Sequence, residues 1–150
     1  MSNDQTPGLP SSLRVSVGGR YWSMEFVRTL PRMYGVTDAP HTKNKKIRIR
    51  QRLKEDVMLD TIIHELLHAA EWDAGEAWIE QIATHTSQVL ILAGWQRKAT
   101  TPTASVEQLR ELVRTCLRLS KPHLDQDKWA TNTAGDIAKV IWKLGWRCEP

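Results

Sequence analysis

Apolar residues recur at intervals of three and four between residues 57 and 70. This is the period of an α-helix that buries one face, so we expect a helix beginning near Lys54. The period stops at residues 73–75, resumes over residues 76–93 and ends at Gly94. Two helices joined by so short a loop run antiparallel, so any fold for this chain has to accommodate such a pair.

The residues before the helices follow the two-residue period of β-strands. Residues 13–17 and 21–27 alternate roughly between apolar and polar on either side of Gly18-Gly19, which predicts a β-hairpin. Residues 46–50 alternate between basic and isoleucine side chains, which predicts a third strand at a sheet edge. The stretch from residue 29 to 44 contains prolines, and we expect it to be irregular.

The C-terminal part of the chain predicts two more helices. Ser105 and Gln108 form a capping-box pattern that begins a helix running to about Ser120, after a polar linker over residues 98–103. The last helix is expected from about Thr133 to Leu144. We therefore predict an α+β fold in which a small antiparallel sheet precedes the antiparallel helix pair and the C-terminal helices.

Composition is consistent with one domain. The 150 residues are 41% hydrophobic and 25% charged, which favours a folded core and excludes disordered and collagen-like classes. We expect residues 1–12 to be a flexible tail and residues 13–150 to form a single domain. The tail lacks the pattern of a signal peptide, and no apolar run is long enough to cross a membrane. Two cysteines without metal-site spacing favour a reducing, cytoplasmic setting.

The motif His64-Glu65-Leu66-Leu67-His68 lies within the most strongly periodic helix. Residues four apart share one helix face, so the two imidazoles are directed at a single point, as in half of a zinc site. The glutamate beside the first histidine is placed to act as a general base on a metal-activated water. This is the arrangement of zinc metallopeptidases, and we favour it over two ordinary surface histidines.

A catalytic zinc ion usually has three protein ligands, so a third is required. The candidates are Glu76, Glu80 and His85, and less plausibly Glu71 or Asp73. If the loop is centred near Ala74, antiparallel pairing places residue 80 opposite residue 68, which favours Glu80. A competing role for Glu76 is to complete a capping box with Asp73.

Cations cluster in the segment from residue 43 to 54 without an intervening acidic residue. The main interpretation is a solvated edge strand whose charges prevent edge-to-edge pairing. The alternative is a surface that binds the phosphate backbone of nucleic acid or a protein partner. The cations are Lys43, Lys45, Lys46, Arg48, Arg50, Arg52 and Lys54.

Three aromatic residues are candidates for a role at the motif site. Trp72 and Trp78 flank the loop between the two helices, where packing at helix ends is the main expectation and lining a substrate pocket the alternative. Tyr34 is a candidate donor to the oxyanion of a transition state.

The motif and the residues that follow it, Glu76-Ala77-Trp78-Ile79-Glu80, resemble the small gluzincin-type metallopeptidases found in phages and prophages. The resemblance covers roughly residues 13–95. It implies a zincin-like fold in which a short β-rich part leads into the motif helix and a glutamate on the next helix completes the site. The spacing of the two glutamates also resembles the thermolysin-like pattern, which implies Glu76 as the ligand and Glu80 as support for a ligating histidine.

The chain departs from better-known relatives, because the step from His68 to Glu76 is shorter than in thermolysin and the Asn-Ala-x-Phe edge-strand signature is absent. A more distant resemblance links residues 64–72 to SprT-type proteases, without their third histidine. The predicted function is zinc-dependent peptide-bond hydrolysis, with Zn²⁺ on His64, His68 and Glu76 and with Glu65 as the base. The substrate is expected to be a peptide or protein in the cytoplasm, of the host if the chain is phage-encoded. The alternative is a non-catalytic binding protein that keeps the zincin fold and uses the basic segment.

Overall fold

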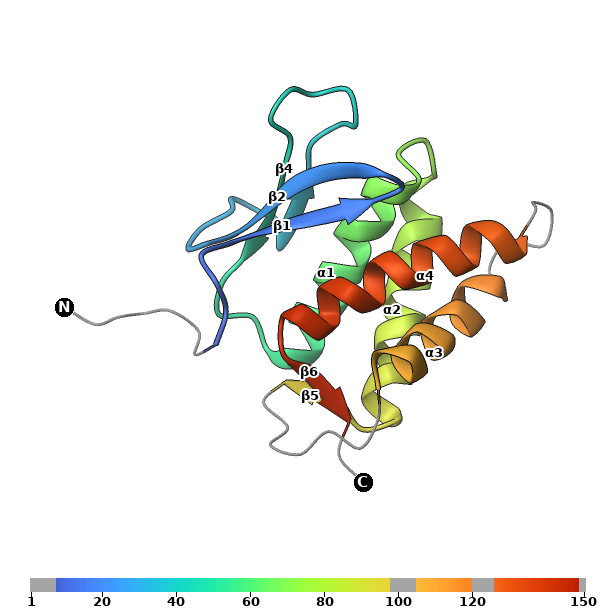
Figure 1. The fold of residues 1–150 in the computed structure, drawn as a ribbon. Helices are drawn as coiled ribbons and strands as arrows, with labels where there is room; N and C mark the ends of the chain where they lie inside the picture. Colours follow the sequence, from blue (N-terminus) through green and yellow to red (C-terminus); the bar gives the residue numbers. More distant parts are fainter. Residues whose placement is uncertain (1–7, 98–104, 120–125, 149–150) are drawn as a thin grey trace.

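The computed structural model describes residues 8–97, 105–119 and 126–148. Within these ranges a four-stranded sheet packs on a set of helices, and a two-stranded sheet lies at the far end of those helices (Figure 1). The predicted α+β class is therefore confirmed. None of the helices in the described ranges is long and apolar enough to span a bilayer.

The large sheet begins with the predicted hairpin. Strand β1 (Ser12–Val17) pairs antiparallel with β2 (Arg20–Val27). Gly18 and Gly19 connect the strands with φ angles of 57° and 75°, a left-handed conformation that glycine adopts without a steric penalty. This turn matches the twist of the flanking strands and fixes the register of the hairpin.

The rest of the sheet differs from the prediction in two ways. The strand order is β1-β2-β4-β3, so β4 (Lys46–Arg50) is an internal strand and the edge is formed by β3 (Gly35–Thr37). The sheet is also mixed, because β4 runs parallel to β2 and antiparallel to β3. Alternation within residues 46–50 indicates that one face of the strand is buried. Edge strands and internal strands both have a buried face, so the alternation does not distinguish them.

The helices follow the predictions closely, with one exception. Helices α1 (Glu55–Ala70) and α2 (Glu76–Leu92) match the periodic segments, and α3 (Val106–Arg118) begins with the capping box of Ser105 and Gln108. Helix α4 (Gln126–Lys143) begins well before the predicted Thr133, because burial of Ala130 extends the packed face beyond the periodic part of the sequence. The predicted linker at residues 98–103 lies outside the described residues.

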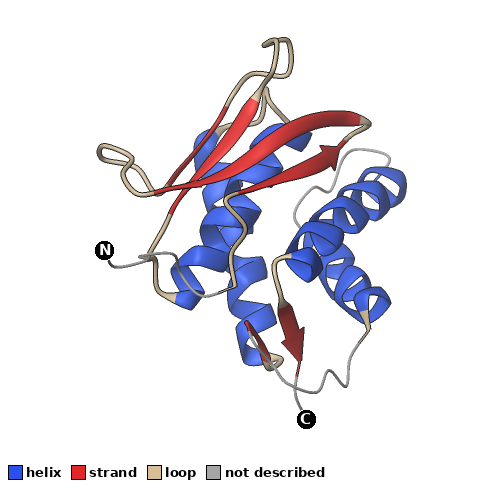
Figure 2. Cartoon of the chain, turned by 60° about the vertical axis from the view of Figure 1, so that its left-hand side comes forward, coloured by secondary structure: helices blue, strands red, loops and turns tan. Residues whose placement is uncertain are grey.

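One face of the sheet packs on the helices, and the opposite face carries no helix (Figure 2). Helix α1 contacts β1, β3 and β4, and α4 contacts β1. Alternate residues of the strands point towards the helices and join the buried core, while their neighbours point away. The buried apolar residues of these four strands are Val15, Val17, Trp22, Met24, Phe26, Ile47 and Ile49.

Residues 9–12 belong to the fold rather than to the predicted flexible tail. Leu9 is 8% exposed, and the Ser11 carbonyl accepts a hydrogen bond of 3.2 Å from the Phe26 amide. Apolar burial and sheet pairing therefore hold these residues although their composition is typical of a tail. Residues 1–7 of the predicted tail lie outside the described part of the chain.

A second, two-stranded sheet follows the ends of α2 and α4. Gly94 and Gly145 have φ angles of 91° and 95° and end these helices, and each is followed by a buried tryptophan. The tryptophans begin β5 (Trp95–Arg97) and β6 (Trp146–Cys148), which pair antiparallel. This pairing joins the C-terminal helices to the motif helix pair.

Candidate metal centre

The register of α1 against α2 determines which side chains meet. His68 contacts Glu76, and Asp60 accepts a hydrogen bond of 3.0 Å from the Thr84 hydroxyl. The paired residue numbers rise on one helix as they fall on the other, so the helices run antiparallel as predicted. This register places Glu76 opposite His68, one helical turn away from the predicted pairing with residue 80.

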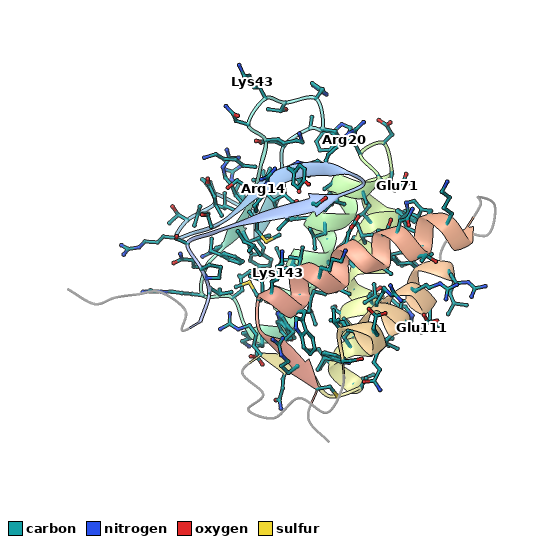
Figure 3. The ribbon with its side chains drawn as sticks, in the orientation of Figure 1. Arg14, Arg20, Lys43, Glu71, Glu111 and Lys143 are labelled. Atoms are coloured by element: carbon teal, nitrogen blue, oxygen red, sulfur yellow. The ribbon has the colours of Figure 1, made fainter. Side chains whose placement is uncertain are left out.

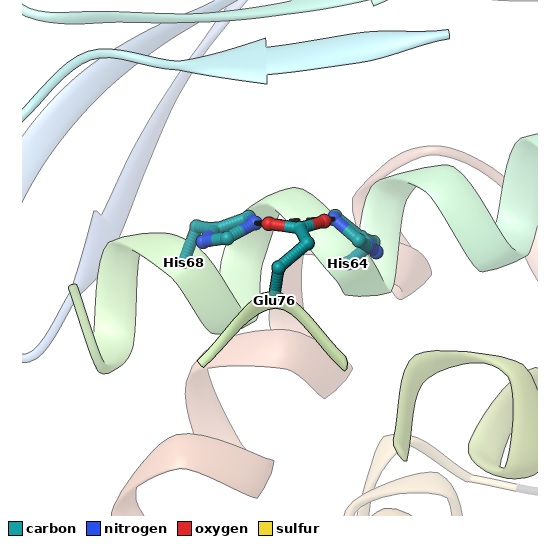
Figure 4. A group of neighbouring side chains, drawn as sticks. All are labelled: His64, His68 and Glu76. Atoms are coloured by element: carbon teal, nitrogen blue, oxygen red, sulfur yellow. Dashed lines mark hydrogen bonds and ion pairs between the residues drawn. The ribbon is translucent and has the colours of Figure 1, made fainter. Parts of the chain in front are cut away.

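Three candidate ligands converge between the two helices (Figure 4). The Glu76 carboxylate spans both imidazoles, with Oε1 2.8 Å from His64 Nε2 and Oε2 2.9 Å from His68 Nε2. The two Nε2 atoms are 3.1 Å apart. One donor atom from each residue lies within 4.8 Å of the others, and no other such group of histidine, cysteine and acidic side chains exists among the described residues.

This donor set fits a divalent metal such as zinc. Two imidazole nitrogens and a carboxylate oxygen are common zinc ligands, and bond lengths near 2 Å bring ligand atoms about as close together as these are. A cation at this point would be bound by both Nε2 atoms and the carboxylate at once. Burial lowers the pKa of His68, partly offset by the Glu76 carboxylate, and so favours the unprotonated imidazole that metal binding requires.

Glu76 is the first residue of α2 and lies at its N-terminal end. Gly75 is the N-cap residue of α2 in an extended conformation, and no side chain caps the helix. The capping box considered for Asp73 and Glu76 is therefore absent. The Glu76 side chain is 66% exposed, while those of His64 and His68 are 20% and 18% exposed, so the candidate centre opens to solvent on the α2 side.

Glu65, next to His64 in the motif, is buried and held by the sheet. The residue is 5% exposed, and its Oε2 accepts a hydrogen bond of 2.7 Å from the Thr37 hydroxyl of β3. Burial raises the pKa of the Glu65 carboxyl, partly offset by the Thr37 hydrogen bond and by His64. A raised carboxyl pKa brings proton affinity closer to that required of a general base near neutral pH.

Gly35 provides the space that the Glu65 side chain occupies. A Cβ atom on Gly35 would lie 2.7 Å from Glu65 Cγ and 2.8 Å from Glu65 Oε1, closer than real contacts of this kind. Neither Gly35 nor Thr37 is predicted from the sequence as a site residue, because their strand lies in a stretch expected to be irregular. The β-branched pair Val36-Thr37 after a glycine was the available signal for a short strand.

A cleft of about 570 Å³ opens beside Glu65 and Glu76, within the size range of ligand sites. Its walls come from α1, α2 and the segment leading into β3. Among the lining residues are Arg32, Tyr34, Asp60, His64, Glu80 and Thr84. The candidate centre is therefore accessible to a ligand that enters between the β3 edge and the helix pair.

The other predicted site residues occupy different positions. Glu80 lines the cleft, but its carboxylate makes no hydrogen bond to either imidazole in the described structure. His85 faces a separate hollow together with Trp78, which packs against Trp129 at 6.1 Å between ring centroids. Neither Trp72 nor Trp78 is among the described residues that line the cleft.

We compared the chain with models of protein families, with curated proteins and with solved structures. None of them matched.

Replacing Gly35 with Ala is expected to displace Glu65 and destabilise the fold by about 1–3 kcal/mol, as overpacking does in a core. Chemical denaturation gives the free energy of unfolding. Gly135→Ala is the matched control, because the nearest atom to its Cβ is 3.7 Å away on a flexible arginine and its helical position favours alanine. Equal stability of the Gly35 variant and the unaltered protein would refute the proposed close packing.

Proposed function

We propose that this chain is a zinc-dependent peptidase with a zincin-like fold, in which His64, His68 and Glu76 hold the metal and Glu65 is the general base. The observation that carries the proposal is the Glu76 carboxylate bridging both imidazoles of the motif. A zinc ion in this position supplies a Lewis acid for the scissile carbonyl and lowers the pKa of water.

The residues of the chain have distinct tasks in this proposal. Glu65 takes the proton of the attacking water and later delivers it to the leaving amine. Thr37 holds Oε2 of that carboxylate, which leaves Oε1, the oxygen beside Gly35, for proton transfer. Tyr34 lines the cleft from the sheet side and stays a candidate for hydrogen bonding to the developing oxyanion.

The edge of β3 is the proposed platform for an extended peptide. The Arg50 amide of β4 donates a backbone hydrogen bond to the Tyr34 carbonyl, and the Asp38 amide donates one to the Lys46 carbonyl of β4. Antiparallel pairing alternates, so Gly35 and Thr37 direct their backbone groups away from β4, towards the open edge. A peptide that adds to this edge would lie next to Glu65, a common mode of peptide recognition.

The proposal predicts that the purified protein hydrolyses peptide bonds in a library of unstructured peptides and that a zinc chelator abolishes the hydrolysis. Adding zinc back should restore the activity, because the ligand side chains remain in place. Product formation by mass spectrometry is the measurement. Hydrolysis that continues after the metal has been removed, verified by elemental analysis, would overturn the proposal.

A further inference from the structure

Charge is divided unevenly between two consecutive segments of the chain, the large sheet and the motif helix pair. Residues 12–54, which form the large sheet, contain eleven Lys and Arg against two Asp and Glu, a balance of +9. Residues 55–97, which form the motif helix pair and β5, contain one Arg against eight Asp and Glu, a balance of −7. The net charge of +4 for the whole chain therefore conceals a strongly basic sheet beside an acidic helix pair.

Much of this positive charge lies on the face of the sheet that carries no helix. Lys46, Arg48 and Arg50 alternate with the buried isoleucines of β4, so their side chains point away from the helices. Arg14 of β1 lies in the same cross-strand row as Lys46, with Ser23 between them. Lys43 extends the charge into the loop before β4 (Figure 3). These five cations make up what we call the basic face.

Acidic residues neutralise only part of the basic face. Lys46 pairs with Glu25 at 2.7 Å, and Arg48 with Asp38 at 3.4 Å. These are the two acidic residues within residues 12–54. Bringing so many like charges onto one surface costs electrostatic energy that an anionic partner would recover.

Protection of a sheet edge does not explain these charges. Basic side chains on an edge strand prevent pairing with other chains. Strand β4 is internal, flanked by β2 and β3, and its backbone is already paired on both sides. The cations of β4 therefore call for another explanation.

The basic face also presents a stacking surface. A hollow of about 540 Å³ is lined by Arg14, Tyr21, Ser23 and Lys46, among others. Tyr21 is 54% exposed, and the Arg14 guanidinium carbon lies 4.0 Å from the centre of its ring. An exposed aromatic ring beside cations is the combination with which proteins bind single strands, because bases stack on the ring while cations contact phosphates.

We propose that the basic face binds single-stranded nucleic acid, with Arg14, Lys46 and Arg50 near phosphates and Tyr21 stacking on a base. The face is a sheet surface without a protruding helix that would enter the major groove of a duplex (Figure 2). The acidic cleft, lined by Asp60, Glu76 and Glu80, repels the same ligand. Binding is therefore independent of the proposed peptidase site.

Fluorescence anisotropy with a labelled oligothymidylate of about 20 nucleotides tests the proposal. We expect binding that weakens between about 50 and 200 mM salt. The Arg14→Ala, Arg50→Ala double variant should bind about tenfold more weakly at the lower salt concentration and reduce the slope of log K against log salt by about 1.4. Tyr21→Ala should weaken binding with little change in that slope, because it removes stacking and no charge.

The matched control is the Lys128→Ala, Lys143→Ala double variant, which removes the same charge from exposed positions of α4. We expect it to bind like the unaltered protein, and circular dichroism checks that both double variants are folded. Equal weakening in the two double variants, or no binding at the lower salt concentration, would overturn the proposal. Tighter binding to duplex DNA or to phosphatidylserine vesicles than to the oligonucleotide would also overturn it.

Discussion

Glu65→Gln is expected to leave the zinc content of the protein unchanged and to lower kcat for peptide hydrolysis by about 10²–10⁴-fold, the usual contribution of a general base. Glutamine has the shape of glutamate, and its amide oxygen can still accept the hydrogen bond from Thr37 that places the side chain. It cannot take a proton from water. The variant therefore separates proton transfer from metal binding.

The control for this substitution is Glu111→Gln, the same change at an exposed position of α3. It should retain full activity. Full activity in the Glu65 variant would refute the role of general base. Loss of zinc together with activity would show instead that Glu65 supports the metal centre structurally.

Glu76→Ala is expected to lower the affinity of the protein for zinc. Loss of a residue that only hydrogen-bonds to a metal ligand lowers the affinity roughly 10–100-fold, and we expect a larger loss here. The reason is that Glu76 contacts both imidazoles directly, at 2.8 Å and 2.9 Å. A competition titration with a fluorescent zinc chelator measures the change. Activity should fall with zinc occupancy at limiting zinc concentrations.

Glu80→Ala is the matched control, one turn further along α2 and also on the cleft. Since its carboxylate contacts neither imidazole, we expect its effect on zinc affinity to stay within about tenfold. A larger loss of affinity in the Glu80 variant than in the Glu76 variant would assign the third ligand to Glu80. That result would mean that α2 is placed one turn differently when metal is bound.

The elements that the sequence predicted well are those with strong local signals. The three-and-four spacing of α1 and α2, the Gly18-Gly19 turn and the capping box at Ser105 each depend on residues close together in the chain. The two histidines and Glu65 of the candidate site were predictable for the same reason, since one helix carries all three.

The features that the sequence did not predict depend on contacts between distant segments. Strand order is one, because the alternation in β4 is the same at an edge and inside a sheet. The partner of Glu65 is another, since Thr37 meets it only when β3 packs against α1. Residue spacing alone favoured Glu80 as the third ligand, because a loop centred near Ala74 would have shifted α2 by one turn.

The zinc content of the protein is the decisive measurement for the candidate metal centre. Protein purified without chelators, and the same protein with His64→Ala, would be measured by elemental analysis before and after incubation with zinc. We expect about one zinc ion per chain in the unaltered protein and little in the variant. Absence of zinc from the unaltered protein, even after incubation, would contradict this and would leave Glu76 as a hydrogen-bond partner of the two histidines.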